Sequence, residues 1–467
     1  MSEPHPTRAS QADAGGRALS GGEPADPAAA SNLPAASPAA VAAVQDASHA
    51  AFHDAPHAAL RYRDFRLFQV ARLTSVLSSE MMAVAVAWQV YSITHRALSL
   101  GYVGLAQFLP SFALFLAAGH AVDRFDRRRL LQVVQFSYAL IIGGLLLYTL
   151  HGSQAVGPIY AILVVQGVAR ALGAPAGQAF MPELVPEHHF ANAVTWGSST
   201  FMIATIIGPG LGGLLYAWLG GAAWVYAAAV LGYLISFGFT TAIRRRTGRL
   251  EPRGASLDTV LAGFRYVWAH QIILGSISLD LFAVLLGGAV ALLPIFASDV
   301  LHAGVRGLGL LRAAPSAGAM IMALVLMFRP LKRHAGALML VCVAIFGAAT
   351  VAFGLSRNLG LSLVLMLIVG ASDMVSVVVR QTLVQIKTPN HMRGRVSAVN
   401  MLFIGTSNEF GEFESGITAQ WLGAVRATVL GGIGTLIIVS LWARLFPELR
   451  QVQSLRSPQS GPAPGAG

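Results

Sequence analysis

The sequence has 467 residues, of which 55% are apolar even before its 49 glycines are counted, and only 11% are charged. A soluble domain carries about 25% charged residues, so this composition excludes a soluble enzyme and indicates a membrane protein with several spans. The net charge of +11 would suggest a nucleic-acid partner in a soluble protein, but here the arginines cluster between apolar stretches, as membrane topology requires, and no nucleic acid is expected.

Two tails enclose the apolar part of the chain. Residues 1–58 are rich in Ala, Pro, Ser and Gly and contain no apolar block, which predicts a disordered tail and excludes a signal peptide there. Residues 451–467 are rich in Ser, Pro and Gly, and we expect a second disordered tail. Targeting to the membrane is therefore expected to depend on the first span.

Twelve apolar segments lie between the tails. A backbone in lipid must satisfy its own hydrogen bonds, and these runs are too long and continuous for barrel strands, so each predicts a transmembrane helix and the fold class is all-α. The predicted spans begin near Leu67, Leu98, Leu130, Val156, Ala193, Ala222, Ile272, Gly307, Ala335, Leu359, Val396 and Ala427.

Basic residues alternate between the connections that join these spans. They are concentrated before span 1 and after spans 2, 6, 8 and 10, as in the run Arg244, Arg245 and Arg246, and the other connections hold few of them. The positive-inside rule therefore predicts that both termini are cytoplasmic. We expect a multi-pass protein of the plasma (cytoplasmic or inner) membrane.

The longest internal connection divides six spans from six. This predicts an N-terminal six-helix bundle over residues 59–243, a cytoplasmic linker over 244–271 and a C-terminal six-helix bundle over 272–450. Apolar residues at helical spacing in the linker predict an amphipathic helix on the membrane surface. These residues are Leu257, Val260, Leu261, Phe264 and Val267.

The two halves also resemble each other in sequence. Gly104-Leu105 and Pro110-Ser111 recur as Gly309-Leu310 and Pro315-Ser316, and a second set recurs at nearly the same offset. This predicts a parallel six-plus-six repeat with its axis along the membrane normal. The second set pairs Gln178, Pro186, His188, Gly208 and Gly213 with Gln381, Pro389, His391, Gly411 and Gly416.

The connection after span 2 carries a motif with a specific spacing. Gly119 precedes Asp123 and Arg124 by one helical turn, and Arg127 and Arg128 follow. A plain positive loop is one interpretation, but the pattern Gly-x-x-x-Asp-Arg-x-x-Arg-Arg resembles that of the major facilitator superfamily. With twelve spans, a six-plus-six repeat and a long middle loop, the resemblance covers residues 61–450 and implies a secondary transporter of that fold.

Three further segments resemble one branch of that superfamily, the enterobactin-exporter-like or transmembrane secretion effector group. They are residues 104–110, 181–186 and 388–397. Members export siderophores or drugs, so the resemblance implies export. It also implies that Asp123 contacts the cytoplasmic end of span 11 and holds the two halves together in the outward-facing state.

Span 5 contains Gly208, Pro209, Gly212 and Gly213, a pattern similar to the antiporter motif of proton-linked efflux proteins. Ala204 replaces one upstream glycine of the full motif. The alternative is that the small residues permit close helix packing and that Pro209 kinks the span.

Ionisable groups at membrane depth cost about 2.5–3.5 kcal/mol each on insertion scales, so each is a functional candidate. Glu80, Arg170, Asp280, Asp373 and Arg380 lie in spans 1, 4, 7 and 10, which line the central cavity by resemblance to the superfamily. Arg170 could neutralise Glu80 or bind an anionic substrate, and a purely structural ion pair is the alternative. Asp373 and Arg380 share a helical face two turns apart, too far for a direct pair but close enough to share a water-filled cavity. The predicted cavity and substrate residues are Arg170, Gln166, Asp373, Arg380 and Asn408.

Span 11 holds three carboxylates within six residues, Glu409, Glu412 and Glu414. Glu409 and Glu412 share a helical face, and carboxylates crowded in a low-dielectric environment can carry a proton. This cluster is our first candidate for proton coupling, with Asp280 and Glu80 as further candidates. The alternative is that these groups hydrogen-bond broken backbone near Gly411 or pair with basic residues across the interface.

The sequence thus predicts a twelve-helix secondary transporter that exports a small organic molecule against inward proton flow by alternating access. Its expected partners are a small-molecule substrate, protons and membrane lipids, and we expect it to function as a monomer. No cofactor is expected, because there is no phosphate-binding Gly-Lys-Ser/Thr loop, and no metal, because the histidines lack ligand spacing. The alternatives are an uptake permease, a lipid or lysophospholipid translocator, or a non-transporting scaffold. An intramembrane enzyme would need a nucleophile–base set, and none is visible.

Overall fold

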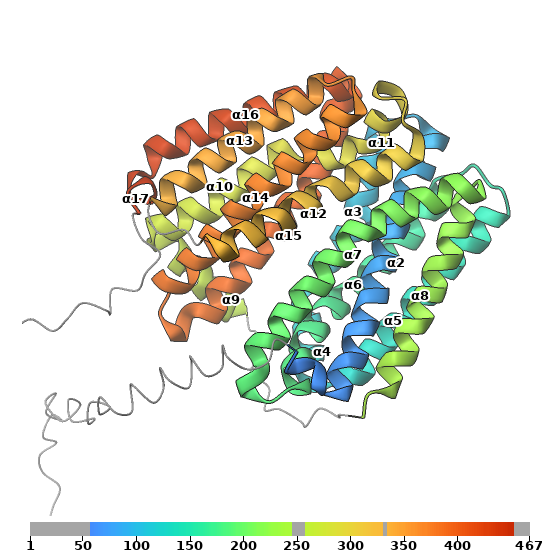
Figure 1. Ribbon diagram of the computed structural model, residues 1–467, viewed down its shortest axis with the longest axis horizontal. Coiled ribbons are helices and arrows are strands. Elements are labelled where there is room, and N and C mark those ends of the chain that lie inside the picture. The colour runs from blue at the N-terminus through green and yellow to red at the C-terminus, as the bar shows by residue number, and fades with distance from the viewer. Residues whose placement is uncertain (1–56, 245–256, 330–333, 453–467) are drawn as a thin grey trace, which may run out of the picture. The chain divides into compact units, whose positions relative to one another are not determined.

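The computed structural model describes residues 57–244, 257–329 and 334–452 (Figure 1). The tails predicted for residues 1–58 and 451–467 therefore lie almost entirely outside the described residues. The same holds for the first part of the predicted linker.

The first half of the described chain forms seven α-helices. Span 2 consists of two of them, α3 and α4, because the chain departs from regular helix at Leu114, shortly after Pro110. The helices are α2 (Arg63–Thr94), α3 (Ala97–Ala113), α4 (Phe115–Arg124), α5 (Arg127–Leu150), α6 (Gly157–Phe180), α7 (Phe190–Leu219) and α8 (Ala222–Ala242).

The second half begins with α9 (Leu257–Ala269), which lies where the amphipathic helix is predicted. Span 7 is irregular, because α10 (Gln271–Gly287) continues into η5 (Ala289–Leu292), α11 (Leu293–Ile295) and the π-helix η6 (Phe296–Val300). The remaining helices are α12 (Gly304–Phe328), α13 (Ala335–Leu355), α14 (Leu359–Lys387), α15 (Asn390–Leu422), α16 (Ala424–Leu445) and α17 (Pro447–Arg450).

Ten helical segments in the described residues are long and apolar enough to cross a membrane. The shorter α3 and the more charged α15 occupy the positions of the remaining predicted spans, 2 and 11. The helix of span 11 begins at Asn390, ahead of the apolar segment that the sequence predicts from near Val396. Pro389 has extended backbone, and the helix starts directly after it, in polar residues that hydropathy does not detect.

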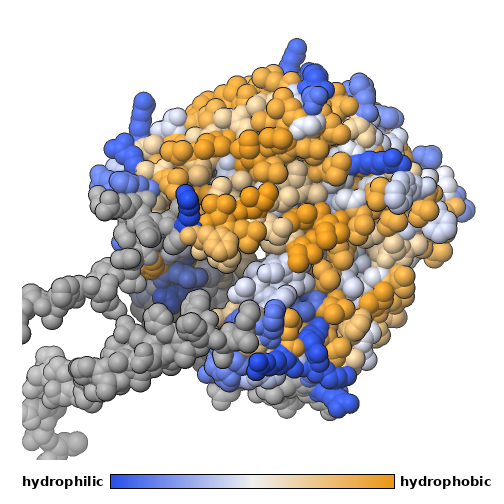
Figure 2. All heavy atoms as spheres, viewed as in Figure 1, coloured by the Kyte–Doolittle hydropathy of each residue, from blue (hydrophilic) through white to orange (hydrophobic). Residues whose placement is uncertain are grey.

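Each half of the structure has its own apolar core. In the first, Ile142, Leu163 and Tyr226 bring α5, α6 and α8 together, and in the second Leu279 and Met339 pack with residues of α14 and α16. We call helices α2–α8 the N-bundle and α10–α16 the C-bundle. Apolar side chains also cover much of the surface shown in Figure 2, and hydrophilic ones gather toward the helix ends. A lipid environment explains so much exposed apolar surface.

The two bundles share an apolar cluster at one end only. There, Tyr91 and Leu100 of the N-bundle pack in one cluster with Leu293, Phe296 and Phe353 of the C-bundle. At the other end, where α2 begins and α4 ends, the described residues form separate clusters, one in each half. Figure 1 shows the helices of the two bundles diverging toward α4 and α9. We call the end with the shared apolar cluster the closed end. The other end, where α2 begins with Arg63 and α5 begins with Arg127, is the basic end.

Glycines allow the close approach of the bundles near the closed end. A Cβ built on Gly213 of α7 would lie 2.6 Å from the Val305 carbonyl oxygen of α12 and 3.1 Å from the Gly309 Cα. On the other side, α3 and α15 meet at Gly101 and Gly416, where an added Cβ would lie 3.1 Å from the facing Cα. Gly213 of span 5 thus permits close packing, as one interpretation of that motif expects, and the similarity to the antiporter motif stays a prediction.

Candidate functional site

An ion pair joins the two bundles in the middle of their helices. Arg170 Nη1 of α6 donates to Glu409 Oε1 of α15 at 2.8 Å. The Glu409 side chain is 12% exposed and that of Arg170 is 50% exposed. The direct partner of Arg170 is thus a residue of the opposite bundle, while its interaction with Glu80, one of the two roles expected for Arg170, is electrostatic only.

Glu412 lies beside this pair, one helical turn further along α15. Both carboxylates face α3 at Gly104, where an added Cβ would lie 2.7 Å from Glu412 Oε2 and 3.4 Å from Glu409 Oε2. Glu412 interacts electrostatically with Glu409, Arg170 and Arg312. A glycine at position 104 thus makes room for two acidic side chains against a neighbouring helix.

Glu80 of α2 belongs to the same group of charges. It interacts electrostatically with Arg312 of α12 and with Arg170, and its Cβ lies 2.6 Å from the position of a Cβ on Gly208. The sequence analysis missed Arg312, although it is a lone charge within an apolar span and the rule that selected Arg170 also applies to it. We call Glu80, Arg170, Arg312, Glu409 and Glu412 the central ion cluster.

The central ion cluster contains three carboxylates and two guanidinium groups. Burial of unbalanced charge is costly, so a set with one excess carboxylate is stabilised by one bound proton or by a cationic group of a ligand. Because the members come from α2, α6, α12 and α15, the balance depends on both bundles. The arrangement can therefore couple proton or ligand binding to their relative position.

A pocket of about 350 Å³ with several charged and aromatic lining residues adjoins this cluster inside the N-bundle. Glu80 and Arg170 line it, together with Arg72, which the sequence analysis also missed. Tyr138 and Tyr233 lie stacked in its wall, with ring centroids 4.9 Å apart and planes 18° from parallel. We call it the N-bundle pocket, and its two guanidinium groups and aromatic wall suit a ligand with anionic and planar parts. Its other lining residues are Phe68, Ala71, Ser75, Val76, Ser79, Leu131, Val134, Gln135, Gly173, Ala174, Gly177, Gln178 and Phe201.

The remaining candidates of spans 4 and 11 lie outside the central ion cluster. Gln166 is buried, and its Nε2 faces the Met82 sulfur at 3.6 Å. Asn408 is exposed. Glu414 Oε1 accepts a hydrogen bond of 2.7 Å from Thr418 on its own helix, so it points away from Glu409 and Glu412 as the helical spacing predicts.

The candidates of spans 7 and 10 lie within the C-bundle. Arg380 of α14 contacts Asp280 of α10 through Nη1 and Oδ2, and both side chains are buried. A small cavity touches Asp280 and Asp373, but Arg380 is not among its lining residues. Asp373 therefore lines this cavity and Arg380 does not, and a water-filled cavity shared by the two stays a prediction.

The motif after span 2 lies at the basic end. Gly119, Asp123 and Arg124 belong to α4, and nothing is described of the Asp123 side chain, so its contact with span 11 stays a prediction. Arg127 pairs with Glu183, and Arg128 Nη2 donates to the Thr241 carbonyl oxygen at 2.6 Å. These two arginines thus attach the start of α5 to neighbouring parts of the N-bundle.

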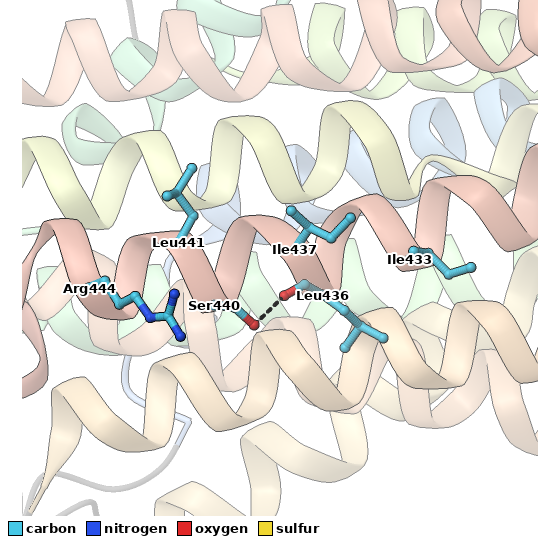
Figure 3. Close-up of a pocket in the computed structure, with 6 residues that line it drawn as sticks. All are labelled: Ile433, Leu436, Ile437, Ser440, Leu441 and Arg444. Carbon is cyan, nitrogen blue, oxygen red and sulfur yellow. Dashed lines mark hydrogen bonds between the residues drawn. The ribbon is translucent and has the colours of Figure 1, made fainter.

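An apolar groove on the outer face of α16 has a different character. Its six lining residues all come from this one helix, and Ser440 Oγ donates back to the Leu436 carbonyl oxygen at 2.9 Å (Figure 3). Ile437 is 61% exposed, and Arg444 lies at the end toward α17. A surface of this kind suits contact with an acyl chain, and we assign it no part in substrate binding.

Comparison with known proteins identifies the family. The sequence profile described as transmembrane secretion effector matches residues 54–465. The chain belongs to this family. Its members are membrane transporters of the major facilitator superfamily. The recognition from the motif after span 2 and from residues 104–110, 181–186 and 388–397 is therefore confirmed, and this family member is a multi-pass transporter and not an enzyme.

Curated relatives and a solved structure agree with this assignment. The chain is 29% identical over 390 residues to proteins named enterobactin exporter EntS from Shigella boydii and Escherichia coli, which is 83% of this chain and 92% of each relative. A bacterial homolog of the human lysosomal transporter Spinster, in an inward-facing and unoccupied conformation, matches with a TM-score of 0.63 at 15% identity, over 83% of this chain and 98% of that one. This structural similarity confirms the predicted all-α major facilitator fold.

Proposed function

We propose that this family member exports a small organic molecule, such as a siderophore or drug, by alternating access coupled to inward proton movement. The central ion cluster carries the proposal, because it joins both bundles and adjoins the N-bundle pocket. The relatives named enterobactin exporter support export and a siderophore-like substrate. The aromatic wall of the pocket and its two arginines, Arg72 and Arg170, fit a ligand with planar and anionic groups.

The proposed orientation follows from the basic residues. Arg63, Arg66, Arg128 and Arg244 lie at the basic end, and the positive-inside rule supports the proposal that this end, and with it both termini, is cytoplasmic. In a bacterial inner membrane the structure then represents an inward-facing state, closed toward the outside. Such a state receives its substrate from the cytoplasm, as an exporter must.

Coupling arises because the Arg170–Glu409 pair crosses between moving bodies. A ligand or proton shifts a conformational equilibrium only as far as it favours one state over the other. A proton on Glu409 or Glu412 weakens the attraction of that side chain to Arg170 of α6 in the opposite bundle, and this changes the free energy of the contact between the two bundles. An anionic substrate bound to Arg170 would compete with Glu409 for the same guanidinium group.

The test is transport by the full chain in liposomes with a pH-sensitive dye inside. Siderophore-like and cationic drug-like compounds are screened with the parent and with Glu409→Gln and Glu412→Gln. Glu414→Gln is the matched control, because Glu414 lies on the same helix and bonds only to Thr418 among the described residues. We expect substrate-dependent proton flux in the parent and in the control, and its loss in the other two variants.

The other outcomes select the alternatives. Substrate movement without proton flux would contradict coupling and leave the carboxylates with a structural role. Accumulation of a compound in the opposite direction would indicate an uptake permease. Movement of lipid alone would indicate a lipid or lysophospholipid translocator, and binding without any flux would indicate a scaffold.

A further inference from the structure

A second group of charges lies inside the C-bundle, apart from the central ion cluster. Arg380 is 2% exposed and Asp280 is 5% exposed, and the two are in contact through Nη1 and Oδ2. Leu279 and Val379, their neighbours in sequence, belong to the apolar core of this bundle. The pair is therefore enclosed by the C-bundle.

This group also contains one more carboxylate than guanidinium groups. Asp373 lies two helical turns before Arg380 on α14 and interacts electrostatically with both Asp280 and Arg380. Its side chain is half-buried, so it is more exposed than Asp280 and Arg380. Two carboxylates and one guanidinium group in an apolar core leave an excess negative charge, which a bound positive charge would stabilise.

A small cavity between the carboxylates gives an independent indication of a bound group. It measures about 10 Å³, close to the space of one water molecule, and Asp280, Asp373 and Ser376 line it. Ser376 is 2% exposed, and its Oγ has no hydrogen-bond partner among the described residues. A buried hydroxyl without a partner is uncommon, and a water molecule in this cavity would satisfy it.

We propose that Asp280 and Asp373 share one exchangeable proton, linked by a water molecule to Ser376. The proton satisfies the charge balance and fits the space. A metal cation such as Ca²⁺ or Mg²⁺ takes about six oxygen ligands, whereas the rest of the lining is apolar. Those apolar residues are Ala283, Val284, Val343 and Phe346.

Apart from the two aspartates, the described residues that line this cavity carry no charge, and Arg380 is the one cation that acts on both aspartates among the described residues. The neighbouring α13 contributes apolar Val343 and Phe346 to the lining, and its Cys342 packs in the adjacent core. On α16, Trp442 lies in the same core and donates to Ser278 at 3.0 Å. Arg312 of α12 and the glutamates Glu409 and Glu412 of α15 belong to the central ion cluster. Each bundle would thus contribute its own titratable carboxylates.

The test measures proton occupancy without substrate and without transport. The full chain in lipid nanodiscs is titrated with acid and base, and infrared difference spectra record the C=O stretch of protonated carboxyl groups. We expect one such signal to disappear in Asp373→Asn, because one carboxylate then faces one guanidinium group. Glu412→Gln is the matched control, since it removes a carboxylate from the central ion cluster and should leave this signal in place.

Three results would overturn the proposal. The first is a parent spectrum without a titrating carboxyl signal, and the second is an Asp373→Asn spectrum equal to that of the parent. The third is displacement of the signal by Na⁺, because a metal cation would then occupy the site. Asp280→Asn is a second route to the same charge balance if Asp373→Asn does not fold. Because the measurement needs no substrate, its failure leaves the proposed export function standing, and the reverse also holds.

Discussion

Arg170 and Glu409 belong to different bundles, yet their side chains meet at 2.8 Å in the middle of the structure. In alternating access the bundles move relative to each other, so this contact cannot contribute equally to both states. Glu412 and Arg312 lie close enough to respond electrostatically when the pair opens. Under the proposed transport cycle, the pair would be the point at which charge and conformation are linked.

The first prediction concerns the strength of this contact. A double-mutant cycle with Arg170→Gln and Glu409→Gln should give an interaction free energy of about 0.5–1 kcal/mol, because the Arg170 side chain is half exposed and solvent screens the attraction. Thermal unfolding of the chain in nanodiscs measures it. A cycle between Arg170→Gln and Glu414→Gln should give no interaction, and an equal value in both cycles would contradict a specific pair.

The second prediction concerns the glycine contact between α7 and α12. In Gly213→Ala the new methyl group would lie 2.6 Å from the backbone oxygen of Val305, which cannot move as a flexible side chain does. The closed end should therefore loosen, and the population should shift toward the state in which the basic end is closed. Distances between spin labels across the basic end should shorten.

Gly210→Ala is the control for this substitution. Gly210 lies in the same helix, and nothing among the described residues lies within 4 Å of its Cβ position. Its label distances should equal those of the parent. Equal shifts in the two variants would show that helix propensity, and not the contact with α12, causes the change.

The architecture could be predicted from the sequence because the relevant information is local. An apolar run of span length, or a group of arginines beside it, can be recognised from residues that are adjacent in the sequence. The helices lie close to where these patterns predict them. The break in span 2, shortly after Pro110, and the π-helix in span 7 were not foreseen, because hydropathy does not distinguish regular helix from a local departure from it. The early start of α15 follows Pro389, a local feature to which hydropathy is insensitive.

The candidate site was predictable in its membership but not in its pairing. Charges within apolar runs can be found in the sequence, as Glu80, Arg170, Glu409 and Glu412 were. Arg312 meets the same criterion and could have been found in the same way. Which acid meets which base depends on how the two bundles face each other, and a single sequence does not contain that register. The sequence therefore left open whether Arg170 neutralises Glu80 or binds an anion, and it did not name Glu409 of α15 as its direct partner.

The third prediction concerns the N-bundle pocket. Arg72 lines it beside Glu80, and a charge-assisted hydrogen bond to an anionic group contributes about 1.5–3 kcal/mol. Arg72→Gln should therefore raise the KM for an anionic substrate at least about tenfold, with little change for a cationic one. Arg66→Gln on the exposed part of the same helix is the control. Equal loss for both classes of substrate would mean that Arg72 has a structural role.

The last prediction concerns a polar contact that holds the closed end. The Tyr91 hydroxyl of α2 donates to Asp299 Oδ2 in the π-helix η6, so it links the N-bundle to the C-bundle. Tyr91→Phe removes one hydrogen bond to a charged group, worth about 1.5–3 kcal/mol, only in the state in which this end is closed. The equilibrium should shift toward the outward-facing state, and a cysteine placed near η6 should react faster with a polar maleimide. Tyr148→Phe is the matched control, because the Tyr148 hydroxyl bonds only within the N-bundle among the described residues. If both variants speed the reaction equally, the loss of a hydroxyl and not of the link between bundles is responsible, and the closed end is held by its apolar cluster and glycine contacts.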